Sequence, residues 1–430
     1  MLKNHPVSLY ITWLVIILIV PLPLVILLNT GLSDSIQHLI IYDAGIVAYV
    51  WWLSIVLLST RPQWLEWRIG LPAMYFVHGL LGVLALGLAT YHVLNAFSMD
   101  QLIKNTGHFA WYLAIFGVLY ASFFLSGWLV DRFPIAASLK RKLQFIFKHQ
   151  LSLWIHRLNF VVIGLIWLHV HLIGRVSQIT DFIILFDVYT IVNLGLYAWK
   201  KFVASSAERL NGQLIDNTEL NQHVRQVKIK LGRKAPKYQA GDFYFLSFQH
   251  VTGLTNESHP FSVTTAPISS PNIITFTIQN TGDFTSQLSS IPTGSDVKLE
   301  GPFGRFAPLI ENANPKIPLI LIGMGTGIAP LLSLTQQYAS SRKIHVLWSV
   351  HEASDFYYQQ AFDSLESLIT FDQHITRFTT LDYQNKLTEQ ELTSALFFIV
   401  GPANGVLSTE KVLRHLGVSA NQLIDERLTM

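Results

Sequence analysis

Five histidines lie within two long apolar stretches of this sequence. His78 and His92 occur in MYFVHGLLGVLALGLATYHVLNAF, and His156, His169 and His171 occur in HRLNFVVIGLIWLHVH. Imidazole inside a lipid bilayer is costly unless a hydrogen-bond partner or a metal satisfies its nitrogens. Neutral imidazole is also a common protein ligand of haem iron. The spacing of these histidines therefore decides whether they could bind metal together.

The histidines fall at two matching depths along two helices. With a rise of about 1.5 Å per residue, His78 and His92 lie ~21 Å apart along their helix. His156 lies ~20 Å from His169, or ~22 Å from His171, along the other helix. This arrangement predicts two haems, each held by one histidine from each helix. The alternative is that the histidines hydrogen-bond across helices or lie at the membrane interface.

The rotation about each helix bears on the choice between His169 and His171. At ~100° per residue, His78 and His92 differ by only ~40° around their helix. His156 differs by ~140° from His169 and by ~60° from His171. Ideal helix geometry alone therefore prefers His171.

These helices belong to an apolar first half of the chain. Of the 430 residues, 50% are hydrophobic and only 13% are charged, and the apolar runs are concentrated in residues 1–200. Six stretches have about the 20 residues that a helix needs to cross a bilayer. They are residues 8–28, 36–59, 71–96, 107–129, 153–174 and 181–199. The pattern predicts a multi-pass unit in a lipid bilayer, followed by a water-facing half.

Positive charge predicts the orientation of the six helices. If the N-terminus is inside, the inner side carries Lys3, Arg61, Arg68, Arg132, Lys140, Arg141, Lys142, Lys148, Lys200 and Lys201. The outer side then carries only Lys104 and Arg175. Because the more positive side is usually cytoplasmic, we expect a cell-membrane protein whose N-terminus and second half are both cytoplasmic.

Composition excludes several classes of function. The chain has no cysteine, so it offers no disulfide, no cysteine-ligated iron–sulfur cluster and no thiolate haem ligand. Its formal net charge is only +3, and no block of basic residues indicates a nucleic-acid partner.

The water-facing half begins with short strand-like runs. HVRQVKIKL, DFYFLSF, IITFTIQ and VKLEG, separated by turn residues, predict a small antiparallel β-barrel. Two stretches beside these strands, HPFSVT and NTGDFTSQL, offer hydroxyls, small residues and an aromatic ring that would suit a flavin. A simple turn or strand end explains each of them equally well.

A glycine-rich loop follows the predicted barrel. IPLILIGMGTGIAPLLSL reads as a buried strand, a loop with Gly323, Gly325 and Gly327, and then a helix. Glycines and a helix N-terminus favour a pyrophosphate, although the spacing is not that of the G-x-G-x-x-G fingerprint. Further strand–helix units predict a parallel α/β sheet. A turn at Gly401 and Pro402 would face the nucleotide at the carboxyl edge of this sheet.

These parts in this order resemble the ferric reductase / NADPH oxidase family over nearly the whole chain. The histidine quartet is similar to that family's transmembrane domain. HPFS and GDFT are similar to its flavin motifs, GPFG at 301–304 to the turn that ends its flavin domain, and GMGTGIAP to its nucleotide loop. The resemblance implies three domains: residues 1–204 as a six-helix transmembrane di-haem domain, 205–312 as an FAD-binding β-barrel domain, and 313–430 as an NAD(P)H-binding α/β domain.

Residue roles carry over by position. The resemblance implies that His78 and His156 bind an inner haem b, and His92 and His169 an outer one, following the family spacing over ideal helix rotation. It implies that FAD contacts His259, Pro260, Phe261 and Ser262 with its ring and ribityl chain, and Gly282 and Thr285 with its phosphates. The nucleotide pyrophosphate would contact Gly323, Gly325, Thr326 and Gly327.

Three positions depart from the family pattern. Val400 stands where the family often has a cysteine, and Leu428 stands where it often has an aromatic residue near the flavin. His351 stands where an arginine often reads the extra phosphate of NADPH. The sequence therefore does not choose between NADPH and NADH as the electron donor.

The resemblance implies a transmembrane oxidoreductase of the NAD(P)H oxidase or ferric reductase type. Electrons would pass from cytoplasmic NAD(P)H through FAD and two b-type haems to a small acceptor on the outer side, either oxygen, which gives superoxide, or ferric iron. Two other functions stay open. The chain could donate electrons to a separate extracytoplasmic redox partner, or it could be a haem-free, membrane-anchored flavin reductase.

Overall fold

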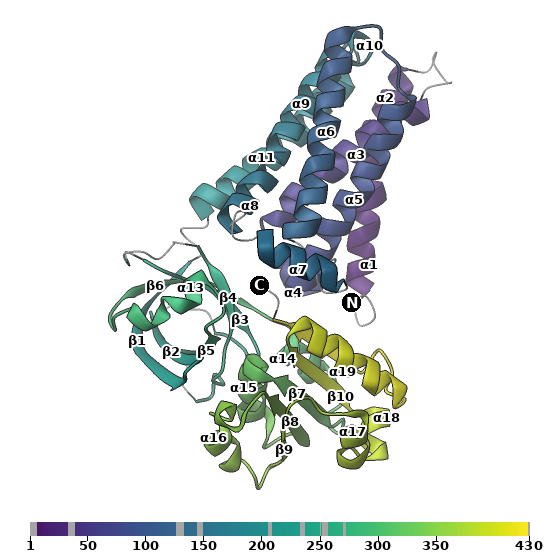
Figure 1. The fold of residues 1–430 in the computed structure, drawn as a ribbon. Helices are drawn as coiled ribbons and strands as arrows, with labels where there is room; N and C mark the ends of the chain where they lie inside the picture. Colours follow the sequence, from purple (N-terminus) through teal and green to yellow (C-terminus); the bar gives the residue numbers. More distant parts are fainter. Residues whose placement is uncertain are drawn as a thin grey trace. The chain divides into compact units, whose positions relative to one another are not determined.

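The computed structural model describes residues 7–32, 39–125, 133–143, 149–204, 209–232, 237–249, 251, 257–269 and 272–428. The chain divides into two compact units, one over His5–Ser205 and one over Ser206–Met430. The first unit is helical, and the second contains two β-sheets with their helices (Figure 1).

The helical unit is built from long apolar helices with short connections. Its elements are α1 Val7–Leu14, the π-helical η1 Val15–Ile19, α2 Leu22–Gly31, α3 Leu39–Ser59, α4 Gln63–Ile69, α5 Leu71–Asn95, α6 Gln101–Phe124, α7 Pro134–Leu143, α8 His149–Arg157, α9 Asn159–Leu172, α10 Gly174–Ser177, α11 Thr180–Trp199 and the π-helical η3 Lys200–Ala204. The helix α3 packs against α5 and α11, and α6 packs against α5 and α9. Buried side chains of α3, such as Tyr49 and Leu53, contribute to the core of this unit.

Six helical stretches among the described residues are long and apolar enough to cross a membrane. They are Leu9–Gly31, Leu39–Ser59, Leu71–Asn95, Gln101–Phe124, Leu151–Leu172 and Thr180–Val203. Six such helices were predicted, and this number is confirmed. The start of the second predicted stretch, at residues 36–38, lies outside the described residues.

The fourth span begins earlier than the sequence indicated. It was predicted over 107–129, but the helix runs over Gln101–Phe124, and 126–129 lie outside the described residues. The polar segment before residue 107 resembled a loop. Asp100 makes it helical, because its carboxylate accepts hydrogen bonds from the N–H groups of Leu102 and Ile103 at 2.7 and 3.1 Å.

The first sheet of the second unit is antiparallel, as predicted, but it does not close into a barrel. Its strands are β1 Leu210–Asn221, β2 Val224–Leu231, β3 Phe243–Phe248, β4 His259–Ser262, β5 Ile273–Gln279 and β6 Asp296–Phe303. They are ordered β4-β3-β6-β1-β2-β5. Among the described residues, the outer strands β4 and β5 are joined by an isolated bridge between Val263 and Phe276. The predicted closed barrel is therefore wrong, because the described strands form no continuous ladder between these edges.

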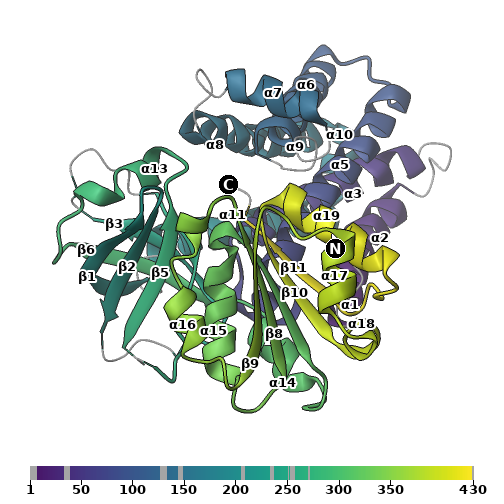
Figure 2. The same cartoon turned by 60° about the horizontal axis from the view of Figure 1, so that its bottom comes forward.

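The second sheet is parallel and carries helices on both faces. Its strands are β7 Leu319–Met324, β8 Ile344–Val350, β9 Ile369–Ile375, β10 Leu396–Gly401 and β11 Leu423–Arg427, in the order β11-β10-β7-β8-β9. One face packs on α14 Phe306–Asn312, α15 Ile328–Tyr338 and α16 Gln359–Asp363. The other packs on α17 Thr380–Lys386, α18 Glu389–Ser394 and α19 Ala403–His415 (Figure 2). All six residues of β7 are buried, as expected for a central parallel strand.

Direct hydrogen bonds join the first sheet to the segment between β8 and α16. The hydroxyl of Tyr358 lies 2.9 Å from the Gln226 side chain and 2.6 Å from the Thr277 hydroxyl. Asn221 donates to the carboxylate of Asp355 at 2.8 Å. Tyr358 is buried, so its hydroxyl replaces water for two polar side chains of the first sheet.

Tyr358→Phe is expected to destabilise the second unit by about 1–3 kcal/mol, because Gln226 and Thr277 each lose a buried partner. Thermal unfolding of the full chain in detergent, followed by flavin fluorescence, measures the change. Tyr338→Phe is the matched control, since that hydroxyl bonds to Glu311 at an exposed position. Equal effects of the two substitutions would contradict the assigned role of Tyr358.

Candidate functional site

The structure brings four of the five histidines together as two pairs. The ring centroids of His78 and His156 are 6.0 Å apart, and those of His92 and His169 are 6.4 Å apart. Two imidazoles that bind one metal from opposite sides, with metal–nitrogen bonds of about 2 Å, hold their centroids roughly 6 Å apart. Both pairs therefore have the spacing of a bis-histidine site.

Each pair supplies only two protein ligands. No group of three or more His, Cys, Asp or Glu side chains in the described part of the chain could hold a metal ion. A haem requires only the two axial ligands, because its porphyrin provides the other nitrogens. The donor set therefore fits haem better than a bare metal ion.

Backbone carbonyls of neighbouring helices fix three of the four rings. The Nδ1–oxygen distances are 3.2 Å from His78 to Ile55, 2.7 Å from His92 to Ile41, and 2.9 Å from His169 to Ile103. A carbonyl oxygen can only accept, so each of these Nδ1 atoms carries the proton and each Nε2 keeps its lone pair. The Nδ1 of His156 instead contacts the side-chain amide of Asn159 at 3.4 Å.

Two glycines make room for the outer pair of imidazoles. A Cβ atom at Gly45 would lie 3.0 Å from Nδ1 of His92, and one at Gly107 would lie 2.9 Å from Cε1 of His169. Each glycine stands four residues after the carbonyl that the ring contacts. Residues four apart share one helix face, so a larger side chain there would stand between the ring and the carbonyl.

His171 points away from both pairs. Its Nε2 lies 3.3 Å from the carboxylate of Asp187, and its Nδ1 lies 2.9 Å from the carbonyl of Trp167. The helix carrying these histidines is interrupted at Leu158, whose N–H bonds three residues back to Ile155. The ideal rotation that favoured His171 does not apply across this interruption.

The two stretches predicted to hold a flavin meet at one aromatic ring. β4 is the HPFS segment itself, and Phe284 belongs to α13 Asp283–Ser286. The Phe284 ring lies 4.3 Å from that of His259 and 6.0 Å from that of Phe261, between centroids. Pro260 is exposed on an edge strand, where a missing N–H costs no ladder hydrogen bond.

Gly282 and Thr285 form the turn that begins α13. The Thr285 hydroxyl accepts from the N–H groups of Thr281 and Gly282, both at 2.9 Å. Thr285 is buried, so its hydroxyl holds the loop in shape. Gly282 is exposed, and a Cβ there would meet nothing within 4 Å. The open space in this turn therefore lies beside Gly282.

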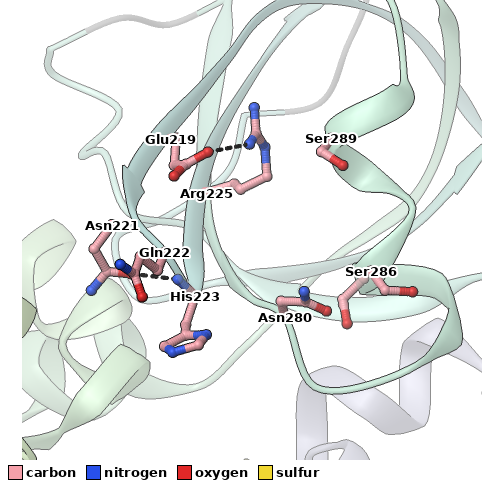
Figure 3. Close-up of a pocket in the computed structure, with 9 residues that line it drawn as sticks. Glu219, Asn221, Gln222, His223, Arg225, Asn280, Ser286 and Ser289 are labelled. Carbon is pink, nitrogen blue, oxygen red and sulfur yellow. Dashed lines mark hydrogen bonds and ion pairs between the residues drawn. The ribbon is translucent and has the colours of Figure 1, made fainter.

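A polar pocket of about 200 Å³ adjoins this turn (Figure 3). It is lined by Glu219, Asn221, Gln222, His223, Arg225, Asn280, Thr285, Ser286 and Ser289. The Arg225 guanidinium is held by Glu219 at 3.2 Å and by the Asn217 carbonyl at 2.9 Å. No lining residue is apolar, so the pocket suits the polar part of a ligand.

A half-buried carboxyl group reaches the end of the HPFS strand. The Ser262 hydroxyl donates to Glu426 at 3.0 Å, and Glu426 lies on β11 of the other sheet. Burial raises the pKa of Glu426 to about 7, the Ser262 hydrogen bond opposes this rise, and nearby Asp425 adds to it. The sequence analysis did not select Glu426, because nothing in its local pattern indicates a partner 164 residues away.

The glycines of the nucleotide loop have different surroundings. Gly325 has φ +56° and open space where its Cβ would lie, so a ligand could approach the backbone there. A Cβ at Gly327 would collide with the carbonyl of Val400, and one at Gly323 would lie 3.1 Å from the Ile328 backbone. These roles parallel those of glycines in dinucleotide-binding turns, where one permits ligand approach and another permits close packing.

Neighbouring strands hold this loop at the carboxyl edge of the sheet. The Trp348 indole donates to the Gly325 carbonyl at 3.0 Å, a contact that the sequence analysis did not predict. The hydroxyl of Thr326 lies 3.5 Å from Gln279 of the other sheet. Gly401 packs on Met324, where a Cβ would come within 2.7 Å.

The departures from the family pattern lie at the same edge of this sheet. Pro402 precedes α19, and the N–H of Leu428 bonds to the carbonyl of Gly401 at 2.9 Å. Leu428 and His351 are both exposed. The Gly401–Pro402 turn, which was predicted to face the nucleotide, is therefore in direct contact with Leu428.

Comparisons with known proteins match the second unit. Residues 210–307 match an FAD-binding domain family, and residues 321–393 match an oxidoreductase NAD-binding domain family. The second unit therefore contains an FAD-binding domain followed by an oxidoreductase NAD-binding domain. The matched segments cover both sheets and include the HPFS segment and the glycine loop.

Individual relatives agree with this assignment. A terephthalate 1,2-dioxygenase reductase component from Comamonas sp is 24% identical over 43% of this chain and 54% of its own length. A superoxide-generating NADPH oxidase heavy chain from Dictyostelium discoideum is 25% identical over 47% of this chain and 42% of its own length. The chain thus spans about half the length of these curated relatives.

Solved structures also align with this unit. A ferredoxin NADP⁺ reductase from Neisseria gonorrhoeae aligns with 51% of this chain and 98% of its own, at 17% identity and a TM-score of 0.44. The two family matches, the NADPH oxidase relative and the six apolar helices together support an architecture like that of the ferric reductase/NADPH oxidase family.

Glu426→Gln is expected to raise the unfolding temperature of the FAD/NAD unit near pH 8 more than near pH 5. The folded-state pKa lies above the ordinary value of 4.5, so the stability contribution of Glu426 is present below about pH 4.5 and lost as pH rises through about 7. Glutamine still accepts the Ser262 hydrogen bond but cannot ionise. Flavin fluorescence of the full chain during heating measures the difference, with exposed Glu366→Gln as control. A pH-independent effect would contradict the raised pKa.

Proposed function

We propose that the chain is a transmembrane oxidoreductase that couples oxidation of cytoplasmic NAD(P)H to reduction of an acceptor on the outer side, with FAD and two b-type haems as its bound redox groups. The observation that carries the proposal is the pairing of imidazoles on the helical unit of an FAD- and NAD-binding oxidoreductase. Paired imidazoles with fixed Nδ1 protons have little use in an anchor that only tethers a soluble reductase.

His78 and His156 would hold the inner haem, and His92 and His169 the outer one. In three of these residues the Nδ1–H group bonds to a carbonyl of another helix, which directs Nε2 toward the partner imidazole. The ring nitrogens of His171 contact the Asp187 carboxylate and the Trp167 carbonyl instead of a partner imidazole. These contacts favour His169 over His171 as the outer ligand.

The second unit would hold FAD and the nucleotide at neighbouring edges of its two sheets. His259, Pro260, Phe261 and Ser262 would contact the flavin and its ribityl chain, with Gly282 at the phosphates and Thr285 shaping that loop. Gly323, Gly325, Thr326 and Gly327, with Gly401 and Pro402, would receive the nucleotide. Bound FAD would supply hydride chemistry and bound haem one-electron chemistry, neither of which a side chain of this protein provides.

The orientation and the domain division complete the proposal. The excess of lysine and arginine on one side supports a cell-membrane protein with its N-terminus and FAD/NAD(P) domains in the cytoplasm. Residues 1–204, 205–312 and 313–430 would be the transmembrane, FAD and NAD(P)H domains. The name of the Dictyostelium relative, a superoxide-generating oxidase, favours oxygen over ferric iron as acceptor.

Vesicles that contain the purified full chain would test this function. NADH or NADPH is added on one side, and cytochrome c or a ferric chelate is trapped on the other. Reduction of the trapped acceptor supports the proposal, and sensitivity to trapped superoxide dismutase identifies oxygen as the direct acceptor. Nucleotide oxidation without transfer across the membrane would refute it and favour the haem-free reductase.

Substitution of single histidines is expected to remove one haem at a time. The reduced-minus-oxidised absorption spectrum and a haem count per chain should show two haems in the wild type and one in both His78→Leu and His169→Leu. His108→Leu is the control, because His108 lies on α6 beside Tyr112 and outside both pairs. Wild-type protein without haem after haem-replete expression would contradict the assignment.

Gly107→Ala is expected to disturb the outer haem alone, because the new Cβ would lie 2.9 Å from the His169 ring. A shifted midpoint potential of one haem in a redox titration, with the other unchanged, is the measurement. Gly87→Ala is the matched control, since a Cβ there meets nothing within 4 Å. Identical titrations for both variants would show that Gly107 is not needed for ligand placement.

A further inference from the structure

A polar cluster joins the last turn of α9 to α11. It consists of Trp167 and His171 on α9 and Asp187 on α11. The Trp167 indole donates to Asp187 Oδ1 at 2.7 Å, and Nε2 of His171 lies 3.3 Å from the same oxygen. The Trp167 and His171 rings lie 4.2 Å apart between centroids. We call these three residues the α9–α11 cluster.

Oxygen atoms contact both nitrogens of the His171 ring. The Trp167 carbonyl lies 2.9 Å from Nδ1, and the Asp187 carboxylate lies 3.3 Å from Nε2. Ionisable groups within apolar helices are rare and usually have a function. His171 and Asp187 belong to neither imidazole pair.

The cluster also reaches the helix that orients His92. The Phe186 ring lies 6.2 Å from that of His171 and stacks on Tyr49 of α3 at 4.7 Å. The Tyr49 hydroxyl lies 2.9 Å from that of Thr190, again on α11. The helix α3 supplies the carbonyl that the His92 ring contacts. Thus α11, which contributes no histidine to the pairs, is bonded to helices that position both outer imidazoles.

We propose that the α9–α11 cluster positions His169 for the outer haem, an inference that rests on the proposed function. His169 stands two residues before His171, in the last turn of α9, which ends at Leu172. The last turn of a helix lacks part of its hydrogen bonding and is held by outside contacts. The polar contacts of the His169 ring with α6 are to the Ile103 carbonyl at 2.9 Å and the Thr106 hydroxyl at 3.4 Å. Asp187, His171 and Trp167 fix the backbone from the opposite side.

Asp187→Leu in the full-length protein tests this role. The variant is expected to lose the outer haem, falling from two haems per chain to one, or to shift its midpoint potential and low-spin EPR signal while the inner haem signals stay unchanged. Asp187→Asn keeps an acceptor for both donors, so it is expected to retain two haems with a smaller shift. Trp167→Phe removes a single hydrogen bond and tests the cluster if Asp187→Leu fails to fold.

The matched control is Asn193→Leu. Asn193 is another polar residue of α11, but its side chain donates to the Tyr189 carbonyl of the same helix at 2.8 Å. It is expected to leave both haems unchanged, and nucleotide-driven flavin reduction should remain normal in every variant. Unaltered outer-haem signals in both Asp187→Leu and Trp167→Phe, or equal effects in Asn193→Leu, would overturn the inference. A wild type without haem would instead overturn the proposed function.

Discussion

The helical unit depends on one constraint: an imidazole in an apolar environment needs a partner for each ring nitrogen. Backbone carbonyls of neighbouring helices satisfy Nδ1 of His78, His92 and His169. Each of these rings also lies beside the histidine ring of another helix, at a centroid distance of 6.0 or 6.4 Å. The helix packing must therefore place a carbonyl on one side of each ring and a second imidazole on the other. The glycines at 45 and 107 open the space for this contact.

In the second unit, glycines and hydrogen bonds shape the predicted nucleotide loop. Its nucleotide loop combines a left-handed glycine with open space at Gly325 and tightly packed glycines at 323 and 327. The indole of Trp348 fixes the loop from the next strand. Tyr358, in the segment before α16, and Glu426, on β11, each bond to a side chain of the first sheet. The two ligand regions of this unit are thus held together by specific hydrogen bonds as well as by apolar packing.

The sequence predicted those elements whose residues form a periodic pattern or have a distinctive composition. Apolar length predicted six helices, and the β–α alternation predicted the parallel sheet. Periodicity did not place His169 correctly, because Leu158 interrupts the ideal helix. The prediction that the first sheet closes into a barrel was wrong, since strand composition indicates pairing but not whether the outer strands meet. The Ser262–Glu426 contact joins residues 164 positions apart and has no local signal.

The carbonyl contacts in the helical unit come from the main chain, which every residue type provides. Side chains at positions 41, 55 and 103 could change without removing the oxygen atoms that the rings contact. An inserted or deleted residue would be different, because it would rotate the rest of the helix by about 100° and turn the carbonyl away. The helices α3 and α6 are therefore constrained in length and register more than in composition. Their related sequences should diverge by substitution while avoiding insertions between these positions.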